Sequence, residues 1–324
     1  MCAFLRALSV ALLFSASAAS AETFSGTYMP GQVHAEEAKS RALCESDSNR
    51  IFVPLGKDSE CVAFSMTKGF DDRRQAVFFF DGDPPPAQDA AAFDDYMMKD
   101  KAMAEKLMSH YAEKFKIQYF YVSRLGVQGS SGNSQTRRTG HETAVFALAT
   151  QLLAKRFNVD KIGIAGQSGG SSIGAGLLTM GFTGAKCLAL GSGAYDLVGL
   201  HYDFLLTHGK RANRALLERT YYNPIDLVSN IEPDVTRRIF VIGDPQDQNA
   251  KFVQQRQFVS DLQANGNNAN LIEVAAYNHH GATTYSLVAA AECMNGETDS
   301  TIEHGLATMT AKAIAREKSK QPSP

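Results

Sequence analysis

The sequence has no block of one charge, and this lack narrows the range of partners. Its 324 residues carry 32 Lys and Arg against 34 Asp and Glu, which gives a formal net charge of −2. Because no long basic or acidic stretch occurs, we do not expect the chain to bind nucleic acid or another polyanion. The chain also has no tryptophan, no internal repeat and no low-complexity tract. Its length is enough for one large or two small domains with an ample core.

Long apolar runs are scarce outside the N-terminus. There, the apolar run Ala7 to Phe14 follows Arg6, and small residues lead to the sequence A-S-A that ends at Ala21. This order is typical of a secretory signal peptide, so we expect cleavage after Ala21. The run is too short to span a bilayer, and we expect no stable membrane anchor. The sequence therefore predicts a periplasmic or secreted protein.

Cysteines are few, and one of the five, Cys2, would leave with the signal peptide. An even number in an exported chain indicates disulfides. Of the three possible pairings, we favour a local bond, Cys44–Cys61, and a long-range bond, Cys187–Cys293. The sequence contains no cysteine cluster and no H-E-x-x-H motif, so we predict no metal site and no cofactor.

Apolar runs alternate with segments of helical periodicity, which predicts a mostly parallel sheet with helices on both faces. The first two strands would form an antiparallel edge, after an extended lead-in that ends at Ser48. The expected strands are Arg50–Leu55, Cys61–Met66, Gln75–Phe80, Ile117–Val122, Ile162–Ala165, Cys187–Leu190, Arg238–Ile242 and Leu271–Ala276. The expected helices lie within Ala87–Phe115, from Thr139 to about Phe157, and over Ala250–Ala264, Thr283–Met294 and Thr301–Lys318.

The stretch that organises the chain is KIGIAGQSGGSSIGAGLL, from Lys161 to Leu178. A strand, a sharp turn and a helix with G-x-S-x-G at the bend form the nucleophile elbow of serine hydrolases. Ser168 would stand at the bend, and Gly166 and Gly170 would leave room for its strained backbone. The N–H of Gly169 would point at an oxyanion. No Gly-Lys-Ser/Thr follows, and the dinucleotide pattern G-x-G-x-x-G is absent, so a phosphate-binding loop is excluded.

A serine nucleophile needs a base, and the base needs a carboxylate to orient it. The strand Arg238–Ile242 is followed by Asp244 and Asp247, and the last strand is followed by His279 and His280. Both pairs would lie at the same edge of the sheet as Ser168, in the chain order Ser, Asp, His. A zinc site at the two histidines lacks the other ligands that zinc requires.

With these motifs, the chain from about Gln75 to Met294 resembles an α/β-hydrolase of the serine-hydrolase type, esterase-like or peptidase-like. The resemblance implies that Asp247 orients the base, with Asp244 as the alternative, and that His280 is the base, with His279 as the alternative. It implies a second oxyanion donor at Gly82 or Asp83, where the family often has His-Gly. The resemblance to the family's loop extends to Arg124, which is expected to be structural; pairing with a substrate carboxylate is the alternative. Glu142 is expected to cap a helix with Thr139.

The predicted architecture is an α/β-hydrolase fold: a mostly parallel central sheet, helices on both faces and a small helical lid. Residues 22–324 would form one domain, with the lid at about Ala194–Pro233. The predicted function is an exported serine hydrolase that cleaves a carboxylic ester through Ser168, His280 and Asp247. Hydrolysis of a small peptide or amide by the same triad is the first alternative, and a binding protein without turnover is the second. The expected partner is a small ester or short peptide.

Overall fold

The computed structural model of the chain describes residues 32–33, 35–70, 73–83, 101–276 and 279–320. The expected signal peptide and the first part of the helix expected within Ala87–Phe115 lie outside these residues.

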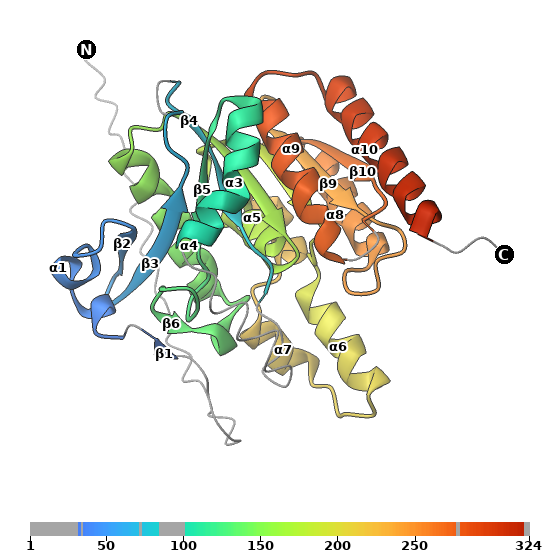
Figure 1. Cartoon of the computed structure of the whole chain (residues 1–324). Helices are drawn as coiled ribbons and strands as arrows, with labels where there is room; N and C mark the ends of the chain where they lie inside the picture. The colour runs from blue at the N-terminus through green and yellow to red at the C-terminus, as the bar shows by residue number, and fades with distance from the viewer. Residues whose placement is uncertain (1–31, 34, 71–72, 84–100, 277–278, 321–324) are drawn as a thin grey trace, which may run out of the picture.

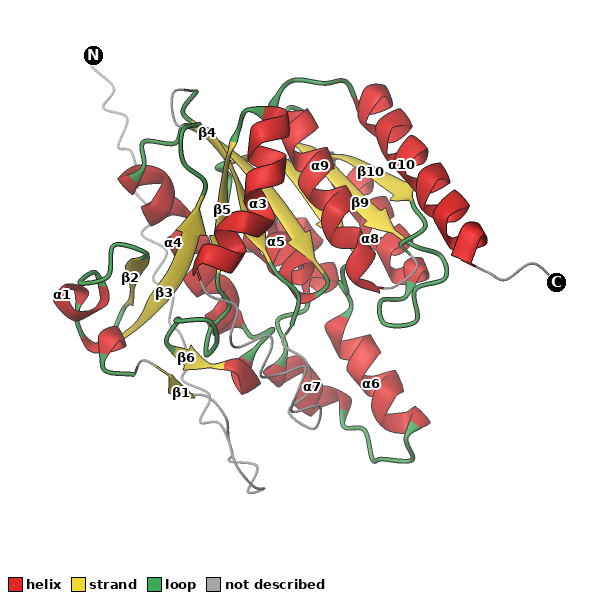
Figure 2. Ribbon diagram, in the orientation of Figure 1, coloured by secondary structure: helices red, strands yellow, loops and turns green. Residues whose placement is uncertain are grey.

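One eight-stranded sheet crosses the molecule in the order β10-β9-β8-β7-β4-β5-β3-β2 (Figures 1 and 2). The strands from β10 to β5 in this order are parallel, whereas β3 and β2 run antiparallel to their neighbours. The mostly parallel sheet and its antiparallel edge are therefore confirmed. The strands are β2 (Arg50–Leu55), β3 (Asp58–Met66), β4 (Gln75–Phe80), β5 (Gln118–Val122), β7 (Lys161–Gln167), β8 (Ala185–Gly191), β9 (Arg238–Gly243) and β10 (Asn268–Glu273).

Helices cover both faces of the sheet, and each face has its own apolar core. Along β4, Phe78 and Phe80 face one core, while Val77 and Phe79 face the other, as the alternation of a strand requires. Every residue of β4 is buried because both faces are covered. On one face lie α4 (Gly140–Arg156), α5 (Gly169–Thr179) and α8 (Phe252–Ala264); on the other lie α3 (Lys101–Phe115), α9 (Ala282–Met294) and α10 (Asp299–Lys320) (Figure 1).

The order of the strands reverses between β4 and β7. From β4 the chain continues to β5 on one side, and it later returns to β7 on the other side of β4. The loops that leave the carboxyl ends of β4 and β7 therefore diverge, and in open α/β sheets ligands bind in the crevice at such a point. The predicted nucleophile and the predicted second oxyanion donor follow these two strands.

Two expected elements are placed differently. The last strand is Asn268–Glu273 instead of Leu271–Ala276, because β10 is an edge strand whose half-buried residues include polar ones. Part of the expected extended lead-in is helical: η1 (Glu37–Lys39) and α1 (Arg41–Cys44) precede β2, and Ser40 caps α1 by accepting the N–H of Leu43. A two-stranded sheet of β1 (Gln32–Val33) and β6 (Gly132–Asn133) was also not expected.

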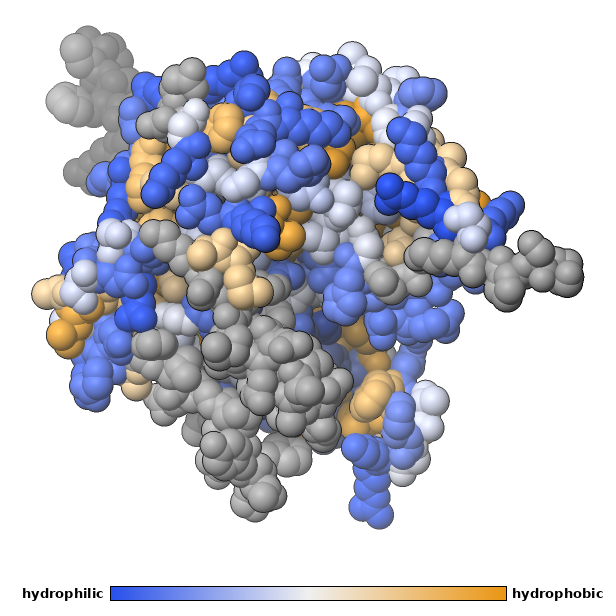
Figure 3. All heavy atoms as spheres, in the orientation of Figure 1, coloured by the Kyte–Doolittle hydropathy of each residue, from blue (hydrophilic) through white to orange (hydrophobic). Residues whose placement is uncertain are grey.

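The stretch expected to be a lid contains α6 (Leu197–Thr207), α7 (Arg214–Thr220) and the 3₁₀ segment η3 (Pro224–Asn230). In Figure 1, α6 and α7 project from the body of the molecule beyond the carboxyl ends of the strands. Phe204 and Leu206 of α6 are exposed, and Figure 3 shows apolar colour over this helix on a face that is otherwise mostly hydrophilic. A lid function for this segment stays a prediction.

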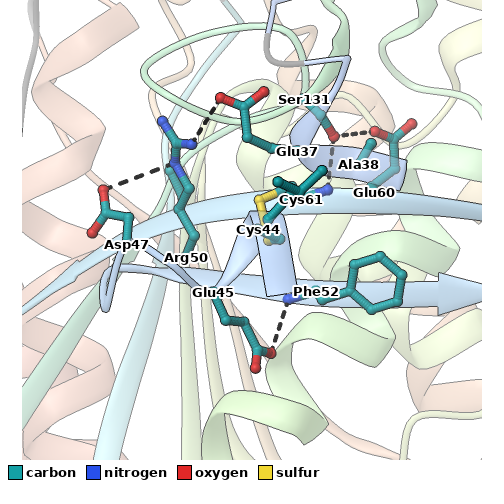
Figure 4. The surroundings of a disulfide bond; sticks show 12 residues. Glu37, Ala38, Cys44, Glu45, Asp47, Arg50, Phe52, Glu60, Cys61 and Ser131 are labelled. Carbon is teal, nitrogen blue, oxygen red and sulfur yellow. Dashed lines mark hydrogen bonds and ion pairs between the residues drawn. A yellow bond between two sulfur atoms is a disulfide. The ribbon is translucent and has the colours of Figure 1, made fainter. Parts of the chain in front are cut away.

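Two disulfides join the cysteines in the pairing that the sequence favoured. Cys44 of α1 is bonded to Cys61 of β3, and Cys187 of β8 is bonded to Cys293 of α9. Figure 4 shows the first bond, with Arg50 paired to Glu37 on one side and Ser131 bonded to Glu60 on the other. No helix in the described ranges is both long and apolar enough to cross a bilayer.

Candidate active site

Ser168 occupies a strained backbone position between β7 and α5. Its φ of 54° and ψ of −118° lie where a residue with a side chain is rarely found. A Cβ on Gly170 would lie 2.0 Å from the carbonyl oxygen of Phe80, and a Cβ on Gly166 would lie 2.7 Å from backbone atoms of Gly170. Neither position has space for a side chain, which is the reason for the two glycines in G-x-S-x-G.

The loop after β4 lies next to Ser168, at the crevice where the strand order reverses. A Cβ on Gly82 would be 3.5 Å from the Cβ of Ser168. The N–H of Gly82 donates to Oδ1 of Asp81 at 2.8 Å. Of the two residues that the sequence offered as the second oxyanion donor, Asp83 is therefore favoured over Gly82, because the N–H of Gly82 already has an acceptor.

Asp247 and His279 form a close pair. Nδ1 of His279 lies 2.7 Å from Oδ2 of Asp247, and the two side chains are 10% and 1% exposed. A carboxylate can only accept, so Nδ1 carries the proton and Nε2 is left as the basic nitrogen. Oδ1 of Asp247 accepts the N–H groups of Asn249 and Ala250, which fixes the carboxylate in its loop.

The histidine beside Asp247 is His279, whereas the sequence favoured His280. The two histidines begin η4 (His279–Gly281), and their rings meet edge to face at 5.8 Å. His280 is exposed, and the ring that contacts Asp247 is that of His279. The turn that carries the two rings is tight: a Cβ on Gly281 would be 2.2 Å from the carbonyl oxygen of Ala276.

The two acids after β9 have different surroundings. Asp244 accepts the N–H of Gln246 with Oδ1 and the N–H of Ala276 with Oδ2, at 2.8 and 2.7 Å, so it ties the end of β9 to the end of β10. Asp247 contacts the histidine. Burial raises the pKa of Asp247, but the hydrogen bond from His279 and the N–H groups of its loop outweigh burial and lower this pKa below its ordinary value. Asp247 is therefore a carboxylate at neutral pH.

Gln167, the residue before Ser168, was not singled out from the sequence. Its side chain is buried, and its Nε2 donates to the carbonyl oxygen of His279 at 3.1 Å. This bond links the elbow directly to the histidine turn. The only signal in the sequence is a long amide side chain immediately before the nucleophile.

Arg124 and Glu142 form a buried, two-bonded ion pair. Nε and Nη2 of Arg124 lie 2.9 and 3.0 Å from the two carboxylate oxygens of Glu142, with both side chains at most 2% exposed. The N–H of Glu142 donates to Oγ1 of Thr139, as a capping box requires. The carboxylate does not complete the box, however: it accepts the N–H of Arg138 at 2.6 Å in addition to the guanidinium. Glu142 therefore does more than cap α4, and Arg124 has the structural role that was expected of it.

Asp83 faces three arginines. Its Oδ1 lies 3.0 Å from Nη2 of Arg124, and its Oδ2 lies 2.7 Å from Nε of Arg138 and 3.4 Å from Nε of Arg137. Burial raises the pKa of Asp83, but the charges of the three arginines outweigh burial and hold the pKa well below its usual range. Because a Cβ on Gly169 would be 2.0 Å from Oδ1, this paired carboxylate lies against the predicted oxyanion donor.

The residues that the structure brings to this edge of the sheet are Ser168, Gly169, Gly82 and Asp83, together with the pair Asp247 and His279. Across the described ranges, no group of three or more His, Cys, Asp or Glu is arranged to hold a metal ion. A serine, a histidine and a carboxylate in this arrangement are suited to acid–base and nucleophilic chemistry by side chains.

The sequence and the fold were compared with those of known proteins. Residues 135–292, just under half of the chain, match the model of the prolyl oligopeptidase family. No curated protein matches the sequence. Among solved structures, Est1E from Butyrivibrio proteoclasticus superposes with a TM-score of 0.53 at 12% identity, over 76% of this chain and 98% of that one.

Acylaminoacyl peptidase from Pyrococcus horikoshii superposes with a TM-score of 0.51 at 15% identity, over 76% of this chain. The match covers 39% of that peptidase, so the chain spans about two fifths of its length. At these identities the likeness to the two structures is one of fold. The prediction of an α/β-hydrolase fold is thereby confirmed.

Proposed function

We propose that this chain, a serine hydrolase of the α/β-hydrolase fold, cleaves carboxylic esters with Ser168 as nucleophile, His279 as base and Asp247 as the residue that orients the base. The observation that carries the proposal is the 2.7 Å contact between His279 and Asp247, linked through Gln167 to the strained turn at Ser168. His279 replaces His280 in this proposal, because Asp247 contacts the ring of His279.

In the proposed reaction, Oγ of Ser168 attacks the carbonyl carbon of the ester while Nε2 of His279 takes the hydroxyl proton. Asp247 holds the ring in the tautomer that leaves Nε2 free to act, and it stabilises the imidazolium that forms. His279 then gives the proton to the leaving alcohol. Water attacks the acyl-enzyme by the same steps and releases the acid.

In this proposal, two backbone N–H groups, those of Gly169 and Asp83, donate hydrogen bonds to the oxyanion of the tetrahedral intermediate. Gly169 begins α5, so the N-terminus of this helix adds its positive end to the site. The carboxylate of Asp83 lies nearby, but three arginines offset its charge. Loss of one donor of this kind typically costs about 3 to 4 kcal/mol of transition-state stabilisation.

Hydrolysis of a small peptide or amide is the second candidate. The match to the prolyl oligopeptidase family over residues 135–292 favours it, because this stretch contains Ser168, Asp247 and both histidines. The same triad serves both reactions. A panel of p-nitrophenyl esters and aminoacyl p-nitroanilides, run on the mature chain, compares the two substrate classes directly.

The proposal is tested with a fluorophosphonate probe and with p-nitrophenyl acetate. Wild-type protein should label and hydrolyse, and Ser168→Ala should lose both activities. The neighbouring histidines provide a matched pair. His279→Ala should reduce kcat by about 10³-fold or more, whereas His280→Ala should keep it within a few-fold, because only His279 contacts Asp247. Equal losses in the two variants, or wild-type rates in Ser168→Ala, would refute the assignment.

We also propose that the protein is exported and that α6 and α7 act as a lid. Two disulfides support an oxidising compartment. The position of α6 and α7 beyond the carboxyl ends of the strands supports the lid. A hollow of about 240 Å³, lined in part by Tyr221 and Tyr222, lies within this segment. The intact mass of the secreted or periplasmic protein should correspond to a chain that starts at Glu22.

A further inference from the structure

Two arginines near the nucleophile have unused hydrogen-bonding capacity. Arg137 and Arg138 lie between η2 (Ser134–Thr136) and α4, and their side chains are 34% and 12% exposed. Each points its Nε at Asp83. Nη1 of Arg137 also donates to the carbonyl oxygen of Ser134 at 3.2 Å. Among the described residues, Nη2 of Arg137 and both Nη atoms of Arg138 donate no hydrogen bond.

The charges of this cluster do not balance. Three guanidinium groups, those of Arg124, Arg137 and Arg138, face the two carboxylates of Asp83 and Glu142. Both carboxylate oxygens of Glu142 accept hydrogen bonds, from the guanidinium of Arg124 and from the N–H of Arg138. The carboxylate of the cluster that faces the side chains of Arg137 and Arg138 is therefore that of Asp83. Counted over these five described residues, one positive charge is in excess at a half-buried place, where a counter-charge is worth more than at the surface.

The cluster adjoins the oxyanion donors on one side and the α6–α7 segment on the other. Asp83 lies against Gly169, as its closeness to a Cβ on that residue shows. The N–H of Tyr222 donates to the carbonyl oxygen of Arg138 at 2.9 Å. His201 stacks on Tyr221 at 4.0 Å. Burial lowers the pKa of His201, and the charges of Arg138 and Arg137 lower it further. An uncharged aromatic pair thus stands within electrostatic range of the arginines.

We propose that Arg137 and Arg138 bind a carboxylate group of the substrate, so that the enzyme prefers esters that carry a free carboxylate in addition to the scissile bond. A guanidinium presents two N–H groups to a carboxylate in one plane, and the unused Nη atoms supply them. The ion pairs between Asp83 and the Nε atoms fix the two side chains, and their Nη atoms are left to bind the carboxylate of the ligand. This inference rests on the proposed ester hydrolysis at Ser168.

The test compares mono-4-nitrophenyl adipate with its methyl ester, two substrates that differ in one charge and share a leaving group. The mature enzyme should have a kcat/KM at least about 10-fold higher for the charged substrate, after subtraction of the rate with Ser168→Ala. Arg137→Gln and Arg138→Gln should each lose about 10- to 100-fold on the charged substrate, as expected for a hydrogen bond between ions. On the methyl ester each variant should lose at least about 5-fold less than on the charged substrate; this smaller loss is the cost of one positive charge fewer beside Asp83, and the remaining turnover shows that the variant is folded.

Two further variants distinguish binding of the substrate carboxylate by the arginines from a purely structural role. Arg316→Gln removes the same charge from the exposed face of α10 and should leave both rates unchanged. Arg138→Lys keeps the charge but loses the planar fork, so it should recover part of the preference for the charged substrate. Potassium chloride at 0.5 M should reduce the preference in the wild type and leave the rate on the methyl ester nearly constant.

A second pair, 4-acetoxybenzoate and its methyl ester, carries the charge on the leaving group. Sensitivity of this pair to Arg138→Gln, with the adipate pair insensitive, would locate the carboxylate on the alcohol side and still support the proposal. Equal losses on charged and neutral substrates in both pairs would mean that the arginines only support the fold, and would overturn it. Absence of labelling and of turnover in the wild type would instead refute the proposed function, and the carboxylate site with it.

Discussion

One carboxylate oxygen of Asp247 accepts hydrogen bonds from its own loop, and the other contacts the histidine ring that it would orient. Oδ1 accepts the N–H groups of Asn249 and Ala250 at 2.8 and 3.2 Å, and Oδ2 faces Nδ1 of His279 at 2.7 Å. The loop bonds fix the carboxylate before any substrate arrives. Such preorganisation is what lets a charge act in a transition state without reorganising first.

This arrangement predicts the effect of Asp247→Asn. The amide keeps the shape of the side chain but can donate to Nδ1, which favours the tautomer with the proton on Nε2. We expect kcat to fall by about 10³- to 10⁴-fold at pH 7, with labelling by the fluorophosphonate slowed in proportion. Asp244→Asn should instead leave kcat within about 10-fold, because Asp244 holds the N–H groups of Gln246 and Ala276 and not the ring. An Asp247→Asn enzyme as active as Asp244→Asn would exclude Asp247 from the triad.

At this scale, the sequence could identify which residue types lie at the site but could not choose between neighbours. G-x-S-x-G and two motifs after later strands were enough to select Ser168 and Asp247. His279 and His280 are adjacent, and which ring faces Asp247 depends on the 3₁₀ turn η4, for which the sequence offers only Gly281. The contacts of Arg137 and Arg138 with Asp83 join positions more than fifty residues apart, and no periodicity indicates them.

Among the elements, α4 and β3 are joined by an ion pair that responds to pH. His141, in the first turn of α4, lies 3.1 Å from Oε1 of Glu60 in β3, and Ser131 donates to the other oxygen of Glu60. The hydrogen bond to Glu60 raises the pKa of His141; burial lowers it, and the charges of Glu60 and Asp58 add to the rise. A cation in the first turn of a helix is unfavourable by itself, so Glu60 offsets a local cost.

The raised pKa fixes the direction of the pH effect. The protonated ring binds Glu60 more strongly in the folded state, so its contribution is fully present below the ordinary histidine value of 6.5 and is lost as the pH rises through the folded value. His141→Gln should lower the free energy of unfolding at pH 5.5 by no more than about 1 kcal/mol, since the ring is 41% exposed, and should have little effect at pH 9.

Urea unfolding at the two pH values measures the effect, and His110→Gln on α3, an exposed histidine, is the matched control. A loss of stability in His141→Gln that is the same at pH 5.5 and pH 9 would show that the ring contributes by packing and not by charge.

Elements buried on both faces were the easiest to predict. Apart from the glutamine at the start of each, β4 and β5 are apolar or aromatic throughout because each is covered on two sides, and their bounds were predicted to within one residue. β10 is an edge strand in which only Ala269 and Ile272 are buried, so its polar first half was missed and the apolar residues beyond its end were taken for strand. Where α6 lies, the sequence indicates only a helical piece around Tyr202–Leu206, because only Leu197 and Val198 of the helix are buried and most of it projects from the body.

In the whole molecule, the two disulfides constrain very different lengths of chain. Cys44 and Cys61 are 17 residues apart, and they tie α1 to the antiparallel edge of the sheet. Cys187 and Cys293 are 106 residues apart, and they tie β8 to α9, the helix that follows the histidine turn. The second loop contains both Asp247 and His279. This bond therefore ties α9, the helix that directly follows the turn with His279, to β8 in the interior of the sheet.

Because the two loops differ in length, removal of each disulfide should lower the free energy of unfolding by a different amount. In the loop-closure account, a loop of about 15 residues is worth about 3 kcal/mol and one of about 100 residues about 4.7 kcal/mol. The double variant Cys187→Ser with Cys293→Ser should therefore lose about 1 to 2 kcal/mol more unfolding free energy than Cys44→Ser with Cys61→Ser, measured by urea unfolding without reductant. All four cysteines are buried, so the cost of burying the new hydroxyl groups is similar in the two variants.

The same pair of variants separates stability from function. If Cys187–Cys293 holds α9 and the histidine turn against β8, its removal should reduce kcat for p-nitrophenyl acetate well below the unfolding temperature, because His279 would be less well placed. Removal of Cys44–Cys61, which lies at the far edge of the sheet, should leave kcat unchanged. Wild-type protein treated with reductant under native conditions should follow the Cys187→Ser, Cys293→Ser variant once its long-range bond opens. Equal stability and equal kcat in the two double variants would show that loop length has no influence here and that α9 is held by its apolar face alone.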